Sequence, residues 1–238
     1  MTPQQAAHET RDAIVTLASK FMTDPGTYAY GSELGFEGMD FYAAGRGGVL
    51  GETSADVVAA ALVFFAPEIV EEAWERSRPV MSRADAAREW AGRCHAVARE
   101  QFPEDFDWPT LADLLGRVVQ TAPVAGAPLF AGWRALPEPD DGRALALHRL
   151  NALRELRGAL HGAAVLTVGL APVEAILVRS PAMIPVFGWQ EAPADPAPFN
   201  ERWALAEART DRMFGRHLAV LGAQERSALV ELLGTLSA

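Results

Sequence analysis

A long run of the chain, from Arg143 to Ala164, repeats its apolar residues with the period of an α-helix. At about 100° per residue these side chains form one stripe, roughly 120° wide, on the helix surface. The stripe consists of Ala146, Leu150, Leu153, Leu156 and Leu160. Such a stripe has to be buried against other elements, so this segment is predicted to be a core helix. His148, Asn151 and Glu155 lie on the opposite face, which we expect to be solvated.

Other predicted helices have recognisable first turns. A hydroxyl side chain followed three residues later by an aspartate can satisfy the free amides at a helix start. The pairs are Thr53 with Asp56, Ser82 with Asp85, and Thr110 with Asp113. They predict helices over 57–65, 82–101 and 111–120. Pro67 cannot continue the first of these, so a break near residue 66 and a second helix over 67–76 are expected.

The remaining segments divide into weaker helical signals and irregular stretches. Helices are expected over 13–21, 172–178, 200–221 and 224–236, while the glycine-rich stretch 23–51 is predicted to be loop or short irregular elements. Strand alternation of period two is not sustained anywhere, and Met183 to Phe187 is the only modest strand candidate. The predicted fold class is therefore mainly α, with a multi-helix, bundle-like architecture.

A proline-rich stretch between Thr121 and Gly142 divides the chain. Leu129, Phe130 and Trp133 make it too apolar for a free linker. The sequence therefore predicts an N-terminal helical half over 1–121, a packed proline-rich connection over 122–142 and a C-terminal helical half over 143–238.

The charge balance opposes some partners and locations. There are 31 acidic and 21 basic residues, a formal net charge of −10, which disfavours approach to nucleic acid or to an anionic membrane. The single cysteine, Cys94, excludes an intramolecular disulfide and a zinc site with several thiolates, and it fits a reducing compartment. The polar start and the lack of an eighteen-residue apolar run predict a cytoplasmic protein that does not span a membrane.

Aromatic side chains in irregular segments suggest a pocket for a hydrophobic ligand, with core filling as the ordinary alternative. Arg46, within Gly45-Arg46-Gly47-Gly48, is a candidate anchor for an anion or carboxylate, with an ordinary turn as the alternative. The full glycine spacing of a phosphate-binding loop is missing. The candidate ligand-binding residues are Arg46, Tyr42, Phe41, Phe65, Phe130, Trp133 and His161.

Three residues are candidates for catalysis. His161 flanks the apolar stripe between Gly158 and Gly162, where a ligand could approach the backbone. His148 and Glu155 lie two helical turns apart, about 10 Å, which is too far for a direct hydrogen bond without bending. Each also has the ordinary interpretation of a packed or solvated side chain. Metal-binding motifs are absent from the sequence, and we expect neither a metal nor a cofactor.

Several short motifs resemble those of an actinobacterial family of poorly characterised helix-turn-helix or winged-helix-like proteins. They are Phe41-Tyr42-Ala43-Ala44-Gly45-Arg46, Leu50-Gly51, Leu129-Phe130-Ala131, Leu153-Arg154-Glu155, Arg157-Gly158, His161 and Glu207-Ala208-Arg209-Thr210-Asp211-Arg212. The last stretch, from Leu221 to Leu233, is similar to the closing dimerisation helix of MarR-type regulators. We therefore favour a homodimer through the C-terminal helices, although their leucines can also bury within one chain.

The resemblance implies a helix, a turn and a two-stranded wing before Glu207. In this chain that space is Trp189 to Asn200, which contains Pro193, Pro196 and Pro198. Prolines remove amide donors that a recognition helix and a β-ribbon both need. We therefore expect a winged-helix-related fold that has lost its wing and its DNA-reading head.

These observations lead to one favoured interpretation and two alternatives. The favoured one is a cytoplasmic protein that binds a small, largely apolar ligand, with nucleic acid unlikely as a partner. The first alternative is a MarR-like DNA-binding transcriptional regulator that uses arginine-bearing helices. The second is a metal-independent enzyme of small-molecule metabolism, with Arg46 as anion anchor and His161 or His148 as acid–base group.

Overall fold

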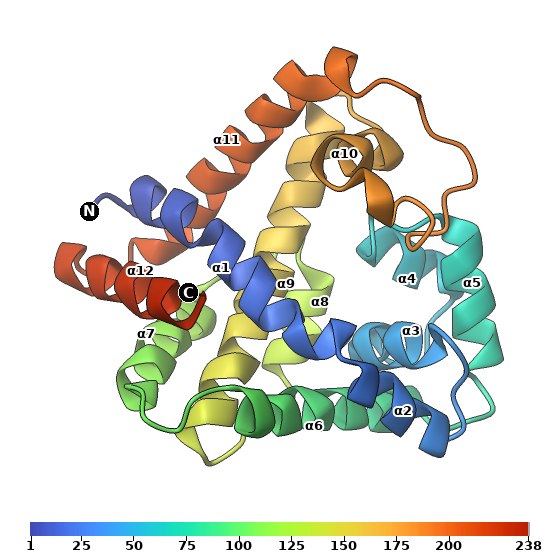
Figure 1. The fold of residues 1–238 in the computed structure, drawn as a ribbon, viewed down its shortest axis with the longest axis horizontal. Helices are drawn as coiled ribbons and strands as arrows, with labels where there is room; N and C mark the ends of the chain where they lie inside the picture. The colour runs from blue at the N-terminus through green and yellow to red at the C-terminus, as the bar shows by residue number, and fades with distance from the viewer. Residues whose placement is uncertain (238) are drawn as a thin grey trace.

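In the computed structural model, which describes residues 1–237, the chain folds into twelve α-helices and three short 3-10 helices (Figure 1). The α-helices are α1 (Pro3–Thr23), α2 (Pro25–Glu33), α3 (Asp40–Gly47), α4 (Ala55–Ala61), α5 (Pro67–Arg76), α6 (Arg83–Gln101), α7 (Trp108–Thr121), α8 (Pro128–Arg134), α9 (Gly142–Thr167), α10 (Pro172–Arg179), α11 (Asn200–Leu218) and α12 (Ala223–Ser237). The 3-10 helices are η1 (Gly48–Leu50), η2 (Pro181–Met183) and η3 (Ala197–Phe199). Residues 1–237 contain no strand, which confirms the mainly-α prediction.

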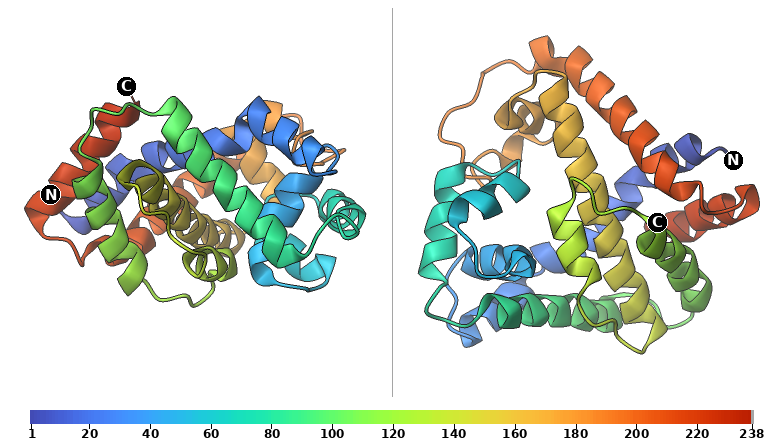
Figure 2. Two further views of the ribbon diagram at one scale, coloured as in Figure 1. Left: turned by 90° about the horizontal axis from the view of Figure 1, so that it is seen from below. Right: turned by 180° about the vertical axis from the view of Figure 1, so that it is seen from behind.

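Helix α9 is the centre of the fold, and α1, α6, α7, α8 and α11 pack around it (Figures 1 and 2). Its apolar stripe is buried as predicted, apart from the half-buried Leu160. The expectation that the opposite face is solvated is wrong, because His148, Asn151 and Glu155 are all buried. A helix enclosed on both sides has to bury its polar face as well, and each buried polar group there needs a partner.

The start of several helices follows the local sequence. Ser82 caps α6 by accepting a hydrogen bond from the amide of Asp85, and Pro67 is the first residue of α5, both as predicted. The start of α7 differs, because Asp107 rather than Thr110 accepts the capping bond. Asp107 precedes Thr110 by three residues, so its carboxylate oxygen accepts from the Thr110 amide and α7 begins one turn earlier than predicted.

The glycine-rich stretch 23–51 forms α2, α3 and η1, so the prediction of an irregular segment is wrong. Two of its glycines are places of close packing. A Cβ on Gly45 would lie 2.5 Å from the Cβ of Trp90, and one on Gly48 would lie 2.4 Å from the carbonyl oxygen of Arg83. These glycines let α3 and η1 approach α6, rather than forming open turns.

A buried aromatic cluster holds the helices around α9 together. The Trp90 ring of α6 lies 5.0 Å from Phe21 of α1 and 5.0 Å from Phe41 of α3. Within the stretch between α7 and α9, α8 buries Phe130 and Trp133. The division of the chain into two halves and a connection stays a prediction.

A second, smaller core ties α10 to the end of α9 and to α11. It contains Val165, Leu170, Leu177, Phe199 and Ala206. Between α10 and α11 the chain forms only η2, turns and η3, so the strand candidate at 183–187 is wrong and a β-wing is absent from 189–200.

The leucines of the last two helices are buried mainly within their own chain. Leu218, Leu221, Leu229 and Leu233 are each at most 1% exposed, and α12 packs on α1. A homodimer through these helices stays a prediction.

No single helix among residues 1–237 has the length and apolar character needed to cross a membrane. Taken together, α9 and α10 meet the length and composition criterion, but they are bent by 110°.

Candidate functional site

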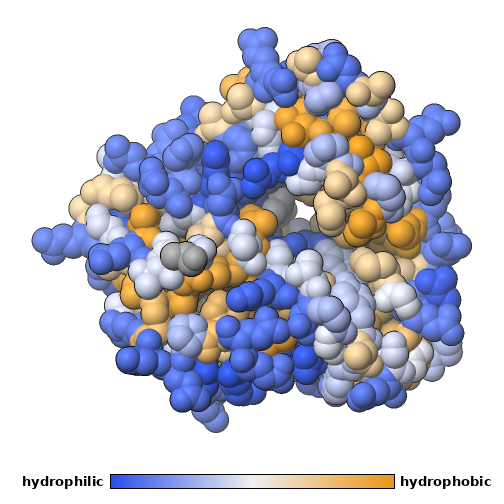
Figure 3. Space-filling view, in the orientation of Figure 1, coloured by the Kyte–Doolittle hydropathy of each residue, from blue (hydrophilic) through white to orange (hydrophobic). Residues whose placement is uncertain are grey.

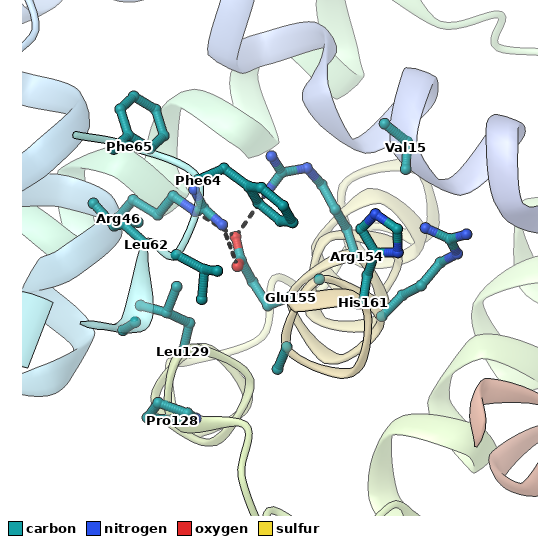
Figure 4. A pocket seen from close by; sticks show the side chains of 15 residues that line it. Val15, Arg46, Leu62, Phe64, Phe65, Pro128, Leu129, Arg154, Glu155 and His161 are labelled. Atoms are coloured by element: carbon teal, nitrogen blue, oxygen red, sulfur yellow. Dashed lines mark hydrogen bonds and ion pairs between the residues drawn. The ribbon is translucent and has the colours of Figure 1, made fainter. Parts of the chain in front are cut away.

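Arg46, the predicted anion anchor, is fully engaged inside the protein. Its Nε and Nη2 donate to the two carboxylate oxygens of Glu155 at 2.8 Å each, and its Nη1 donates to the Tyr42 hydroxyl at 2.5 Å. Arg154 also donates to Glu155, at 2.8 Å. Figure 4 shows the two arginines converging on this carboxylate, whose side chain is 2% exposed.

The electrostatics of this cluster are those of a closed ion pair. Burial alone would raise the pKa of Glu155, but Arg46 and Arg154 outweigh it and hold that pKa below its ordinary value. Burial alone would lower the pKa of Arg46, but Glu155 and Tyr42 outweigh it and raise that pKa. Both groups are therefore charged and paired, and Arg46 has no free charge to offer an incoming anion.

The other candidates from the sequence separate into two groups. Phe41, Phe130 and Trp133 are at most 1% exposed and fill the core, whereas Phe65 and His161 line a cavity. The structure therefore brings Arg46, Tyr42, Glu155, Phe65 and His161 to one region of the molecule.

His148 lies elsewhere, with His95 as its partner. The Nδ1 of His148 is 3.1 Å from the Nε2 of His95, and its backbone carbonyl accepts a hydrogen bond from the Trp133 indole. Burial, together with the neighbouring His95, lowers the pKa of His148 to about 4. His148 and Arg46 line no common cavity, whereas His161 and Arg46 both line the inner cavity, so of the two histidines in the enzyme alternative only His161 meets Arg46 in one cleft.

Two adjoining cavities lie next to the Arg46–Glu155 pair. The inner cavity has a volume of about 170 Å³ and is lined by Arg46, Phe65, Leu129 and Glu155 among others (Figure 4). The outer cavity has a volume of about 550 Å³ and lies between α1, α9, α10 and α11. Val15, Phe64, Arg157 and His161 line both. Figure 3 shows the surface hollowed near the centre of this face, with hydrophobic residues beside the hollow.

Charged side chains of α11 form one wall of the outer cavity. Glu207 and Asp211 are one helical turn apart and point the same way. Glu207 accepts a 2.9 Å bond from Arg157, and Asp211 lies 3.0 Å from the Nδ1 of His8. Read along the sequence alone, these acids interleave with the arginines of the same helix, a pattern that is typical of surface ion pairs. Their i, i+4 spacing opposite the arginines of the same helix was the signal that could have located the wall.

His161 occupies the junction of the two cavities, and its hydrogen bonds assign its tautomer. The Thr210 hydroxyl donates to the carbonyl of Ala206 at 2.8 Å, so its oxygen accepts from the Nδ1 of His161 at 3.0 Å. Burial lowers the pKa of His161 to about 4, so the ring is neutral at pH 7. Its Nε2 is then a hydrogen-bond acceptor, and it has no partner among residues 1–237.

A helix–turn–helix arrangement joins the top of α9 to α10. The connecting turn is residues 168–171, and its Gly169 has φ +76°, a left-handed conformation that suits glycine. The two helices are bent by 110°. Two helices at about 90–120° joined by a three- or four-residue turn are the geometry of the helix-turn-helix motif.

Helix α11 presents arginines beside this turn. Arg202 donates to the carbonyl of Gly169 at 2.5 Å, and Arg209 donates to the Thr167 carbonyl at 3.4 Å. Together with Arg212 and Arg216 they lie within roughly 80° of the helix surface, opposite Glu207 and the buried side of α11. Within residues 1–237 these four arginines have no carboxylate within 4.0 Å. We call them the α11 arginine face: Arg202, Arg209, Arg212 and Arg216.

Comparison with known proteins gives one match. A family model described as a helix-turn-helix family matches residues 7–203. Among curated proteins and among solved structures, nothing matches.

This match contradicts the interpretation favoured from the sequence, a ligand-binding protein without a competent DNA-reading head. That interpretation looked for a wing and a recognition helix only after Phe187. The helix–turn–helix geometry lies before that residue, in α9 and α10. The net charge of −10 does not indicate the α11 arginine face either, because a sum over the chain does not record where the charges lie.

Proposed function

We propose that this protein, which belongs to the helix-turn-helix family over residues 7–203, is a DNA-binding transcriptional regulator. The observation that carries the proposal is the α11 arginine face beside the α9–α10 turn, within a chain of that family. Arg212 and Arg216 are exposed, and Arg202 and Arg209 are hydrogen-bonded only to neutral oxygens of Gly169 and Thr167, so no carboxylate neutralises their charge towards phosphates.

The arrangement favours one orientation on DNA. From Arg202 to Arg216 the arginine face extends about 21 Å along α11, long enough to follow several phosphates. Helix α5, by contrast, exposes Glu68, Glu71 and Glu72 on another side of the molecule (Figure 1). DNA approaching α11 and the α9–α10 turn avoids that acidic helix, so a local contact is compatible with the acidic total.

The binding has a calculable dependence on salt. Each phosphate neutralised contributes about −0.9 to the slope of log K against log salt, so four contacts give about −3.6. Affinity is then expected to fall roughly 100-fold between 50 and 200 mM KCl. Fluorescence anisotropy with labelled duplexes, drawn from a pool of fragments of the host genome, measures this slope.

The deciding variant replaces Arg209, Arg212 and Arg216 by glutamine. One contact remains, so the slope is expected to fall to about −0.9, with weaker binding at every salt concentration. Absence of binding by the unmodified protein at 50 mM KCl and 10 μM protein contradicts the proposal.

A matched control changes the same formal charge elsewhere. Arg78, Arg88 and Arg99 are exposed and each is paired with a carboxylate of its own chain. Their triple glutamine variant is expected to bind duplex DNA with nearly the affinity and slope of the unmodified protein. If it weakens binding as much as the α11 variant does, only the overall charge matters and the α11 arginine face is not the contact surface.

A homodimer through α12, like that of MarR-type regulators, is part of the same proposal. Dimeric helix-turn-helix proteins read two half-sites one helical turn apart, which gives dimerisation a function. On α12, Val230, Leu232 and Leu236 are only half-buried within the chain. Sedimentation velocity is expected to show a species of twice 25.6 kDa that reverts to the monomer when Leu232 and Leu236 are replaced by serine.

A further inference from the structure

We infer that the outer cavity is a binding site for an uncharged aromatic molecule that carries one N–H or O–H donor. This inference concerns a different surface from the α11 arginine face and does not depend on DNA binding. The volume of about 550 Å³ lies within the range of small-molecule sites in proteins. Three features of the lining define the ligand: its charge balance, its aromatic walls and one unpaired acceptor.

The charges of the lining are balanced, which favours a neutral ligand. Three arginines and three carboxylates face the cavity. Arg179 pairs with Asp12 at 2.9 Å, Arg157 pairs with Glu207 at 2.9 Å, and Arg11 lies 3.9 Å from Asp211. At the Arg157–Glu207 pair, whose side chains are 8% and 17% exposed, a charged ligand would have to break the pair and leave its partner charge uncompensated in a partly buried site.

The walls of the cavity favour a flat, aromatic ligand. The His161 ring lies 5.6 Å from the ring of Phe64 and 5.1 Å, edge to face, from that of Trp203. Phe187 and Ile176 complete the apolar lining. Rings in offset or edge-to-face contact gain more than area burial alone, so such walls select planar molecules.

The unpaired acceptor fixes the polar group of the ligand. The neutral His161 ring donates through Nδ1 to Thr210, and its Nε2 has no partner among the described residues. This nitrogen is not enclosed by protein atoms. A ligand N–H or O–H directed at Nε2 satisfies it, whereas an isostere without a donor leaves it unpaired.

Two bicyclic probes of nearly equal shape test this chemistry. Indole carries an N–H where benzofuran has an oxygen without a hydrogen. Ligand-observed NMR titration of the full chain without DNA gives both dissociation constants. Indole is expected to bind about fivefold more tightly, the gain of one hydrogen bond. Equal affinities, or no binding of either probe at millimolar concentration, overturn the inference.

Variants locate the effect within the molecule. His161→Leu keeps the bulk and removes the acceptor, so the preference for indole is expected to vanish. His217→Leu, a histidine outside both cavities, is expected to keep it. If His161→Leu still prefers indole to benzofuran, another group accepts the hydrogen bond from the ligand and the inference is wrong.

A second variant avoids the buried histidine altogether. Ala204 lines the outer cavity and is itself exposed on α11, so Ala204→Trp fills the mouth with little strain on the fold. Binding of both probes is expected to be lost, with an unchanged melting temperature. Undiminished binding of indole to this variant places the site outside the outer cavity and overturns the inference.

Discussion

Replacing Glu155 by glutamine tests whether the buried ion pair between α3 and α9 holds the fold together. The carboxylate accepts both bonds of Arg46 and one of Arg154, and its side chain is 2% exposed. Glutamine keeps the volume but leaves the 12%-exposed Arg46 guanidinium without its counter-charge. Removing one partner of a buried pair costs about 3–5 kcal/mol. Because glutamine retains one acceptor, we expect the lower end, about 3 kcal/mol.

The assay is urea denaturation followed by circular dichroism, with melting temperature as a second readout. For a chain of this size about 3 kcal/mol lowers the melting temperature by roughly 6–12 °C. The double variant Arg46→Met with Glu155→Leu removes both charges and is expected to recover most of the loss. The exposed pair is the control: Glu75→Gln, which frees Arg78, is expected to cost less than about 1 kcal/mol.

The result that refutes this reasoning is specific. If Glu155→Gln costs less than about 1 kcal/mol, the Arg46 guanidinium finds water or another partner and the pair is not a structural lock. If the double variant is as unstable as the single one, the loss comes from shape and packing rather than from an uncompensated charge.

Two further predictions concern pH and backbone packing. Burial lowers the pKa of both His148 and His161 to about 4, against 6.5 in an unfolded chain, so the unfolded state binds more protons between these values. The contribution of these histidines to the free energy of unfolding should therefore be fully present above pH 6.5 and decrease as the pH falls towards 4. The decrease is expected to be up to about 1.4 kcal/mol per pH unit for each histidine. A urea midpoint that rises when the pH is lowered from 6.5 to 5 contradicts this prediction. Gly48→Ala places a Cβ 2.4 Å from the Arg83 carbonyl oxygen and should lower the free energy of unfolding by about 1–3 kcal/mol. In α9, a Cβ on Gly158 has nothing within 4 Å, so Gly158→Ala should raise the free energy of unfolding by up to about 1 kcal/mol. Equal urea midpoints for the two variants contradict the packing argument.

The helices that could be predicted from the sequence are those with a local cause. Ser82 caps α6 through an amide three residues away, and Pro67 begins α5 because its missing N–H is not needed there. The apolar stripe of α9 has the helical period and is buried. In each case the interaction that decides the structure lies within one or two turns of chain, so the residues alone contain it.

The site could not be predicted in the same way, because its contacts join distant parts of the chain. Arg46 meets Glu155 across 109 residues, and His161 meets Thr210 across 49. Single-sequence reasoning can identify a polar face on a helix, but whether that face meets water or an arginine depends on the packing of the neighbouring helices. The glycine-rich stretch shows the same limit, since Gly48 is explained by the approach of Arg83 and not by a turn.

Helix α11 shows why the proposed DNA-contact surface was harder to predict than the fold. Two of its three acidic residues, Glu207 and Asp211, face the outer cavity, while Arg209, Arg212 and Arg216 lie on the far side of the same helix. Counted along the sequence, these charges interleave and largely cancel, which suggests a surface of ion pairs. Arranged on a helix, Glu207 and Asp211 separate from the arginines, because these two acids are one turn apart on one face and the arginines lie on the opposite face, with only Glu201 of the first turn beside them. A short stretch with little net charge thereby supplies both a paired, neutral cavity wall and a basic surface, in a protein whose total charge is −10. The net charge therefore disfavours DNA at an average point of the surface, but it does not describe the arginine side of α11.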